Sequence, residues 1–245
     1  MCEITRVFDA PDRFPLPGET VVWRYMGFDK FISLLGLEEL YFSHLTNFPD
    51  KEEMMIPCFN ELRKLENWET DEGCSQTYAE VEQRCKQLAK NVFVSCWTEA
   101  DGESFAQWKI YGEAGVAIKS TVDRLKQSIQ FRTVDPKEVF VSRVEYKDSV
   151  DKINLHTLAG TKRKPYTFEN EIRMYFDFEG AGDIRSRLGY KPVGRGLKVD
   201  LDILVESVYV SPAAKSWMTQ PVIRLLEKLG KEQLTIKVVG SDIRI

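Results

Sequence analysis

The chain has 245 residues, of which 43% are hydrophobic, 29% are charged and 11% are aromatic. This balance is typical of an ordinary globular protein and excludes wholesale disorder. The ionisable side chains sum to a net charge of −4, which argues against a protein that binds nucleic acid with its whole surface but leaves room for a local basic groove. The longest clean apolar runs, such as residues 92–94, are far shorter than the roughly 20 residues of a membrane span, so we expect no membrane association.

The cysteines and histidines indicate reducing conditions and no metal centre. Five cysteines, at positions 2, 58, 74, 85 and 96, form an odd set without a Cys-x-x-Cys pair, and the chain has only two histidines. Residues 1–6 lack the charged segment and the apolar core of a secretory signal. We therefore predict reduced thiols, a cytoplasmic location and no bound metal ion.

The N-terminal part of the chain predicts two strands separated by a helix. Residues 1–19, which prolines punctuate, are predicted to be an irregular lead. β-Branched and aromatic residues predict a strand over 21–26, and apolar residues at helical spacing predict a helix over 28–35 that ends at Gly36. A second short strand is expected over 40–43.

The segment from 51 to about 90 is charged and mostly compatible with helix. Its best helix covers residues 78–88, where apolar residues recur at helical spacing. The segment has too few apolar residues to form a core of its own. We therefore predict a helical insertion within a single domain that spans residues 1–245.

The remainder of the chain predicts short strands that outnumber the helices. Strands are expected over 92–97, 115–119, 139–146, 171–178, 197–199, 204–210 and 234–239. Helices are expected over 104–111, 122–129 and 221–229, with a further helix start at Ser211 and Pro212. This order predicts an α+β fold in which helices pack on a mainly antiparallel sheet.

Common catalytic motifs are absent, because the sequence contains no phosphate loop, no Gly-x-Gly-x-x-Gly and no Gly-x-Ser-x-Gly. Three other constellations stand out, and the first is Arg24 between Trp23 and Tyr25. An arginine among aromatic residues is awkward in a core because its charge needs a partner there. Either Arg24 points to solvent, or its fixed donors contact an anion or a ribose.

The second constellation is residues 41–48, where aromatic side chains at a strand end are followed by hydroxyl groups. Tyr41 and Ser43 are its first members. Such a segment suits a pocket that stacks a flat ring and forms hydrogen bonds to its polar edge. An edge strand followed by a turn explains the same residues equally well.

The third constellation is Glu169, Glu171 and Arg173, whose spacing places them on one face of a strand. Two like charges on one face repel each other unless the face is wet or one of them is neutralised. Either the strand start is simply solvated, or one carboxylate stabilises an oxocarbenium-like transition state and the other activates a nucleophile. The basic run at 162–164 is either a solvated loop or a contact for a phosphate or a nucleic-acid backbone.

The order of these segments resembles a widespread microbial family that is catalogued as domain of unknown function 2971. The resemblance spans residues 21–245 and is carried by the motifs Trp-Arg-Tyr-Met at 23–26, Leu-Tyr-Phe-Ser at 40–43, Val-Ser-Cys-Trp-Thr at 94–98, Gly-Val-Ala-Ile at 115–118 and Phe-Glu-x-Glu-x-Arg at 168–173. The family tends to have Asp-Pro and an acidic residue after the phenylalanine, whereas residues 48–53 here read Phe-Pro-Asp-Lys-Glu-Glu. The family name itself implies no activity.

A more distant resemblance is to the ADP-ribosyltransferase-like fold, which implies a split antiparallel sheet. It implies that Arg24 contacts the ribose or phosphate of a nucleotide and that Tyr41 or Ser43 lines a nicotinamide pocket. It also implies that Glu171 holds the ribose 2′-hydroxyl and that Glu169 positions the acceptor. We predict a catalytic set of Glu171, Glu169 and Arg24, and a nucleotide-binding set of Arg24, Tyr25, Tyr41, Ser43, Trp97 and Arg173.

The resemblance implies an NAD-consuming enzyme, either an ADP-ribosyltransferase or an NAD glycohydrolase, that serves as a toxin or an anti-phage defence effector. NAD would be its substrate, and the acceptor would be a protein or a nucleic acid. The alternative is a non-catalytic module of a defence system that binds a nucleotide or a nucleic acid. A third reading is a protein that binds a partner through its 51–90 segment.

Overall fold

The computed structural model describes residues 6–48, 50, 78–133, 135–148, 150, 153–178, 194–214 and 216–244. The strands are β1 (Val7–Asp9), β2 (Val21–Gly27), β3 (Glu39–His44), β4 (Val92–Glu99), β5 (Gly115–Thr121), β6 (Val139–Arg143), β7 (Glu145–Tyr146), β8 (Thr161–Lys162), β9 (Glu171–Asp177), β10 (Gly194–Lys198), β11 (Ser207–Val210) and β12 (Val238–Gly240). The α-helices are α1 (Phe28–Leu37), α3 (Tyr78–Ala89), α4 (Phe105–Gln107), α5 (Val122–Ser128), α6 (Leu155–Gly160), α8 (Leu201–Leu204), α9 (Thr219–Lys228) and α10 (Glu232–Thr235). Shorter helical turns are η1 (Leu45–Asn47), the π-helical η3 (Trp108–Gly112), η4 (Lys164–Glu169) and η5 (Ser216–Met218).

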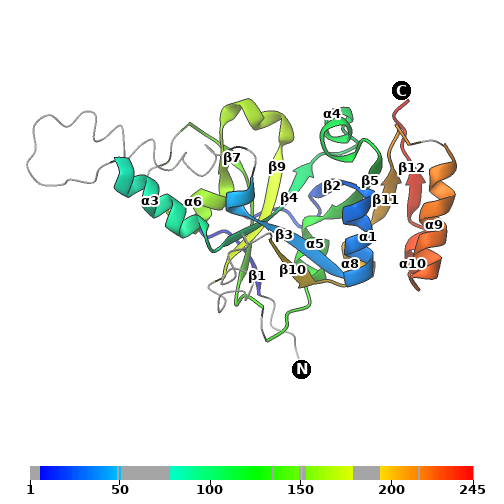
Figure 1. Ribbon diagram of the computed structural model, residues 1–245, viewed down its shortest axis with the longest axis horizontal. Coiled ribbons are helices and arrows are strands. Elements are labelled where there is room, and N and C mark those ends of the chain that lie inside the picture. Colours follow the sequence, from blue (N-terminus) through cyan, green and yellow to red (C-terminus); the bar gives the residue numbers. More distant parts are fainter. Residues whose placement is uncertain are drawn as a thin grey trace, which may run out of the picture.

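The fold is α+β with a large mixed sheet and helices on it (Figure 1). The sheet runs in the order β1-β6-β9-β4-β2-β5-β11-β12, and β3 and β10 branch from β4. The inner pairs are antiparallel, as predicted, but β1 pairs with β6 and β11 pairs with β12 in parallel at the two edges. Parallel pairing requires a long crossover, which the sequence pattern of a single strand does not reveal.

Strand β4 shares one of its edges between two neighbours. Strand β2 pairs with β4 through Val22 and Trp23, and β3 pairs with β4 through Ser43 and His44. Among the described strands, none pairs with residues 95–97 on that edge, so the sheet opens between β2 and β3. In Figure 1, β3 crosses obliquely in front of the sheet at this point.

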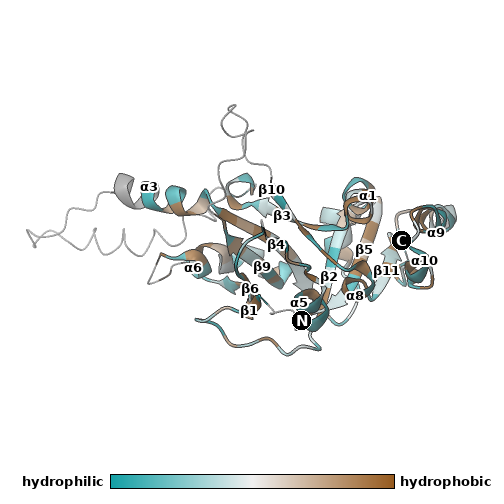
Figure 2. Ribbon diagram, turned by 90° about the horizontal axis from the view of Figure 1, so that it is seen from below, coloured by the Kyte–Doolittle hydropathy of each residue, from teal (hydrophilic) through white to brown (hydrophobic). Residues whose placement is uncertain are grey.

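Side chains alternate between the two faces of the sheet along each strand, and residues of β2 on both faces are packed into hydrophobic cores. On β2, Val22 and Met26 join the main core with helix α1, whereas Trp23 and Tyr25 pack on the opposite face against Trp108 of η3. Figure 2 shows that hydrophobic residues are concentrated along the central strands. An Arg24 side chain between two buried aromatics therefore lies on the α1 side of the sheet.

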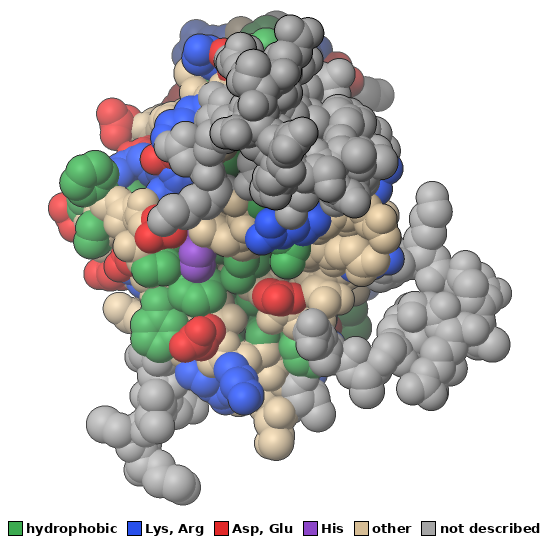
Figure 3. Space-filling model, turned by 90° about the vertical axis from the view of Figure 1, so that its left-hand side faces the viewer, with side chains coloured by type: hydrophobic (Ala, Val, Ile, Leu, Met, Phe, Trp, Pro, Cys, Tyr) green, Lys and Arg blue, Asp and Glu red, His purple; other side chains and the backbone are tan. Residues whose placement is uncertain are grey.

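A smaller core lies at the end of the molecule that carries α3 and α6. Leu158 and Tyr175 belong to it, and His156 donates to or accepts from the Tyr175 hydroxyl at 3.1 Å. The surface at this end shows hydrophobic side chains beside acidic and basic ones (Figure 3). No helix in the described parts of the chain is long and apolar enough to cross a membrane.

Several local predictions are corrected by the structure. The lead is not wholly irregular, because Val7–Asp9 forms β1 before the first proline. Helix α1 continues through Gly36 and ends at Leu37, and the next residue, Glu38, adopts a left-handed conformation with φ 51°. Ser211 does not start a helix, since its hydroxyl donates to the Glu113 carbonyl and ties β11 to the end of η3. Part of the predicted last strand is helix α10, because tertiary packing of Leu234 overrides its strand-like pattern.

The predicted 51–90 insertion is described only in part. Helix α3 confirms the predicted helix near residues 78–88, and residues 51–77 lie outside the described residues. The prediction of reduced thiols is wrong for Cys85 on α3, which is disulfide-bonded, whereas Cys96 is a free thiol. Cysteine spacing does not show which thiols the fold brings within bonding distance.

Candidate functional site

A cleft of about 400 Å³ opens where β2 and β3 part along β4. Its walls come from β2, β3, β4, the loop after η1, the π-helical turn η3, and the segment from β8 to β9. The predicted site residues that line it are Arg24, Tyr25, Tyr41, Ser43, Trp97, Glu169 and Glu171. The structure therefore brings predicted site residues from distant parts of the chain to one cleft.

Arg24 is on β2, and its side chain reaches the unpaired edge of β4. Its guanidinium donates to the Ser95 hydroxyl at 2.5 Å and to the Tyr41 carbonyl at 3.0 Å, so it bridges the gap between the strands. Its central carbon is 5.6 Å from the centre of the Trp97 ring, within range of a cation–π interaction. In the described part of the chain, no carboxylate forms an ion pair with Arg24. Burial lowers the pKa of Arg24 to about 10, which leaves it positively charged at neutral pH, and none of the described carboxylates serves as its counter-ion.

Glu169 and Glu171 enter the cleft through a turn rather than along one strand. Glu169 ends η4, Asn170 adopts a left-handed conformation with φ 40°, and Glu171 begins β9. The Asn170 side chain donates to the Glu99 carbonyl at 2.7 Å, which anchors this turn to the end of β4. Both glutamates line the cleft, as the prediction of a shared face implies. The turn at Asn170, and not alternation along one strand, places them there.

Each glutamate is held by fixed donors. Lys162 donates to Oε2 of Glu169 at 2.5 Å, and the Tyr111 hydroxyl donates to Oε1 at 3.1 Å. Arg173 donates to Oε2 of Glu171 at 2.8 Å, and the Lys162 ammonium lies 3.7 Å from the same oxygen. Both glutamates are only 6% exposed. Their orientations are therefore set before any ligand arrives.

The electrostatics of this cluster keep Glu171 ionised. Burial alone would raise the pKa of Glu171, but the nearby Arg173 and Lys162 outweigh it and lower the pKa below its ordinary value. The Cys96 thiol forms a hydrogen bond with Glu171, and burial together with the glutamate charge raises the pKa of Cys96 well above its ordinary value. Cys96 is therefore a protonated donor to Glu171 rather than a thiolate nucleophile.

Arg173 is the predicted binding residue that does not line the cleft. Its side chain is fully buried behind Glu171, and its guanidinium also donates to the Ala159 carbonyl at 2.8 Å. The expected contact with a nucleotide is thus replaced by a positioning role. Strand alternation places Arg173 on the same face as Glu171 but one residue pair deeper in the sheet.

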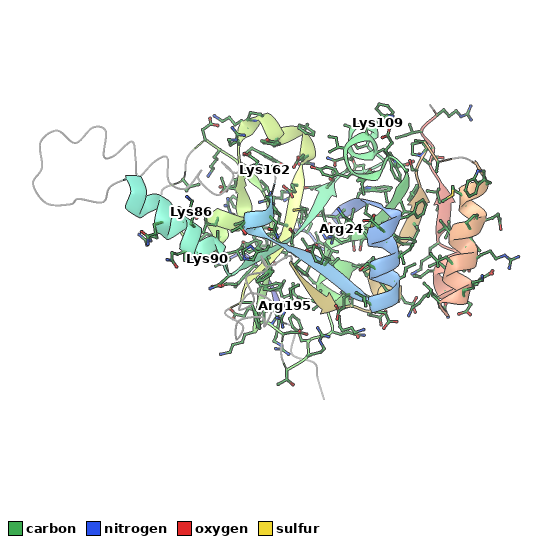
Figure 4. The ribbon with its side chains drawn as sticks, viewed as in Figure 1. Arg24, Lys86, Lys90, Lys109, Lys162 and Arg195 are labelled. Atoms are coloured by element: carbon green, nitrogen blue, oxygen red, sulfur yellow. The ribbon has the colours of Figure 1, made fainter. Side chains whose placement is uncertain are left out.

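The sequence analysis did not single out several residues of the cleft as site residues, among them Lys162, Tyr111 and Gln107. Lys162 was part of a basic run interpreted as a loop or a phosphate contact, but it is a buried ion-pair partner of the glutamates (Figure 4). Tyr111 and Gln107 belong to an aromatic-rich segment that resembles ordinary core. Gln107 and Trp97 line the cleft, and each has a side-chain nitrogen that is shielded from solvent and has no hydrogen-bond partner among the described residues.

A second cavity of about 370 Å³ adjoins the cleft beneath helix α1. The cavity and the cleft share Arg24, Met26, Lys30, Tyr41 and Trp97. Arg24 thus lies at the junction of two hollows, near the middle of the molecule in Figure 4.

The described residues contain no group of three or more His, Cys, Asp or Glu side chains placed to hold a metal ion. The chain matches no protein-family model, and no curated protein or solved structure matches it significantly. The chemistry of the cleft therefore provides the basis for a proposed function.

Proposed function

We propose that the chain is an NAD-consuming enzyme with an ADP-ribosyltransferase-like fold and that it belongs to the family of domain of unknown function 2971. The observation that carries the proposal is that Arg24, without a carboxylate partner in the described chain, and Glu171, held ionised, line one cleft. A positive end and a carboxylate end suit a ligand that carries phosphates on one side and a ribose on the other.

The reaction would break the bond between the nicotinamide nitrogen and the ribose. The bonding electron pair leaves with nicotinamide, so positive charge develops on the ribose. Glu171 would stabilise that charge and hold the 2′-hydroxyl, and one such contact is worth about 3 kcal/mol. Arg173 and Lys162 keep the carboxylate in place and ionised.

The ribose is then captured by a nucleophile. In a glycohydrolase that nucleophile is water, and in a transferase it is a side chain or nucleic-acid group of the acceptor. Glu169 would orient the nucleophile and receive its proton. The ion pair between Glu169 and Lys162 would have to break for this step, and Lys162 would then compensate the negative charge of the site. An enzyme that consumes NAD or modifies an essential molecule in this way would serve as a toxin or an anti-phage effector.

The test is release of free nicotinamide from NAD by the purified chain. Glu171→Gln keeps the size of the side chain and removes its charge, so we expect the rate to fall by about 10²- to 10³-fold. Glu206→Gln is the matched control, because Glu206 pairs with Lys119 and does not line the cleft. Absence of nicotinamide release by the unmodified chain, or an unchanged rate for Glu171→Gln, contradicts the proposal.

One observation favours a second candidate, a non-catalytic module that binds a nucleotide or nucleic acid. All three acidic residues of the cleft have protein partners: Glu169 pairs with Lys162, Glu171 with Arg173 and Asp50 with Arg163. Arg24 is then a simple anion contact and the glutamates are structural. Titration at several salt concentrations separates the cases, because many phosphate contacts give a steep loss of affinity with salt and one arginine gives a shallow loss.

A further inference from the structure

Glu169 is held by two donors that come from different walls of the cleft. Glu169 ends η4 and Tyr111 lies on the π-helical turn η3, and both residues line the cleft. The Tyr111 hydroxyl donates to Oε1 of Glu169 at 3.1 Å, whereas the Lys162 ammonium donates to Oε2 at 2.5 Å. One oxygen of this carboxylate therefore has a neutral donor and the other has a charged donor.

The turn η3 is anchored to strands β2 and β11, away from the glutamate cluster. The ring of Trp108 packs edge-on against the ring of Tyr25 on β2, with 5.0 Å between the ring centres. The hydroxyl of Ser211, which follows β11, donates to the Glu113 carbonyl at the end of η3 at 2.7 Å. The placement of Tyr111 therefore does not depend on the ion pairs of the glutamates, and single π-helical turns of this kind are frequent at functional sites.

The two donors differ in how easily they can release Glu169. Burial and the neighbouring glutamate charge raise the pKa of Tyr111 above its ordinary value, so its hydroxyl remains a donor at neutral pH. The Lys162 ammonium also lies 3.7 Å from Oε2 of Glu171, so it can leave Glu169 and still have a carboxylate partner. Loss of the contact between Lys162 and Glu169 thus exposes Oε2 without leaving the buried ammonium unpaired.

We propose that Tyr111 is a positioning residue for Glu169 and that Oε2 of Glu169 is the atom that receives the proton of the nucleophile. This inference rests on the proposed function. The bond between the ribose carbon and the nicotinamide nitrogen breaks, and its electron pair leaves with nicotinamide. The nucleophile forms the new bond to the ribose carbon, and its proton passes to Oε2 and later to water. Tyr111 holds Oε1 during this exchange while Lys162 moves to Glu171, so the base remains oriented by a third group.

A double-mutant cycle on nicotinamide release from NAD by the full chain tests this role. Tyr111→Phe keeps the ring and removes the hydroxyl, so kcat should fall about tenfold, the scale of one hydrogen bond, while KM stays within about twofold. Glu169→Gln removes the proton acceptor and should lower kcat about 10²-fold. Tyr111→Phe should then cause no further loss in the Glu169→Gln background, because no base is left to position. Tyr209→Phe is the matched control, since Tyr209 also packs against an aromatic ring but does not line the cleft.

Rescue by azide separates a positioning role from damage to the fold. Azide is an anionic nucleophile that has no proton to lose, so it should restore most of the lost rate in Tyr111→Phe and Glu169→Gln. It should not restore the rate in Glu171→Gln, where the charge that stabilises the ribose is missing.

The outcomes distinguish this inference from the proposed function. If the unmodified chain releases nicotinamide but Tyr111→Phe retains its kcat, the positioning role is overturned and the proposed function stands. The same holds if Tyr111→Phe lowers kcat equally with and without Glu169, or if azide fails to restore its rate. If the unmodified chain releases no nicotinamide, the proposed function and the role of Tyr111 are overturned together.

Discussion

The two ends of the cleft differ in whether their charged side chains form ion pairs with other described residues. At the end formed by Glu169 and Glu171, each carboxylate has a protein cation within hydrogen-bonding distance. At the other end, Arg24 is surrounded by Ser95, the Tyr41 backbone and the Trp97 ring, and no described carboxylate pairs with it. Both glutamates are buried and Arg24 is part-buried, and the two ends differ most clearly in whether a described counter-charge is present.

We interpret the paired glutamate end as a preorganised part of the site and the Arg24 end as the part that binds a ligand. A buried charge that is fully paired holds a geometry, and removal of one partner leaves the other charge exposed to a low-dielectric interior. A partly buried charge without a counter-ion destabilises the fold slightly and persists where a ligand completes it. The comparison therefore predicts large losses of stability at the glutamate end and losses of binding at the Arg24 end.

The largest effect is expected for Arg173→Met. This change removes the donor at 2.8 Å from Glu171 and leaves that carboxylate buried, so the free energy of unfolding should fall by about 3–5 kcal/mol. Urea denaturation of both proteins measures this difference in the free energy of unfolding. Arg143→Met is the control, because the Arg143–Glu99 pair is partly exposed and should contribute about 0–1 kcal/mol. Equal losses in the two variants would show that burial does not distinguish the pairs.

A smaller effect is expected for Lys162→Met. Glu169 loses the donor at 2.5 Å, while Glu171 keeps Arg173, so the loss of unfolding free energy should be about 2 kcal/mol. Lys162→Arg should restore part of it, because the positive charge returns. A Lys162→Met variant as stable as the unmodified chain would show that the ammonium does not support the glutamates.

The pH dependence of stability sharpens the same comparison. Because the pKa of Glu171 is lower in the folded chain than its ordinary value of 4.5, the charged form stabilises the fold above that value. This stabilisation is lost as the pH falls below about 4.5 and through the lower folded pKa. Denaturation of the unmodified chain between pH 6 and pH 3 should therefore show a steeper loss than denaturation of Glu171→Gln. Parallel curves would contradict the lowered pKa.

The smallest change in stability is expected for Arg24→Met. The side chain loses two hydrogen bonds but also removes an uncompensated charge, so the free energy of unfolding should change by less than about 1 kcal/mol. NAD affinity should nevertheless fall about tenfold or more, since the proposed phosphate contact is lost. Thermal denaturation and calorimetry on one sample measure both. A strong loss of stability with unchanged NAD affinity would make Arg24 structural.

Much of the local structure is readable from the chain. Runs of β-branched, apolar and aromatic residues predict β2, β4 and β5, alternation predicts β9, and residues compatible with helix predict α1, α3 and α9. An arginine between aromatics and two closely spaced glutamates also stand out, because buried or repelling charges conflict with ordinary core chemistry. These are properties of neighbouring residues, and so sequence alone determined them.

Other features depend on which distant segments meet. The parallel edges of the sheet, the shared edge of β4 and the cavity beneath helix α1 arise from strand pairing across long sequence separations. Whether Lys162 is a solvated loop residue or the partner of Glu169 likewise depended on how η4 folds back onto β8 and β9. Charge, unlike hydrophobic periodicity, carries no local sign of its partner. Only the tertiary structure therefore decided that the glutamates form ion pairs and that Arg24 has no carboxylate partner among the described residues.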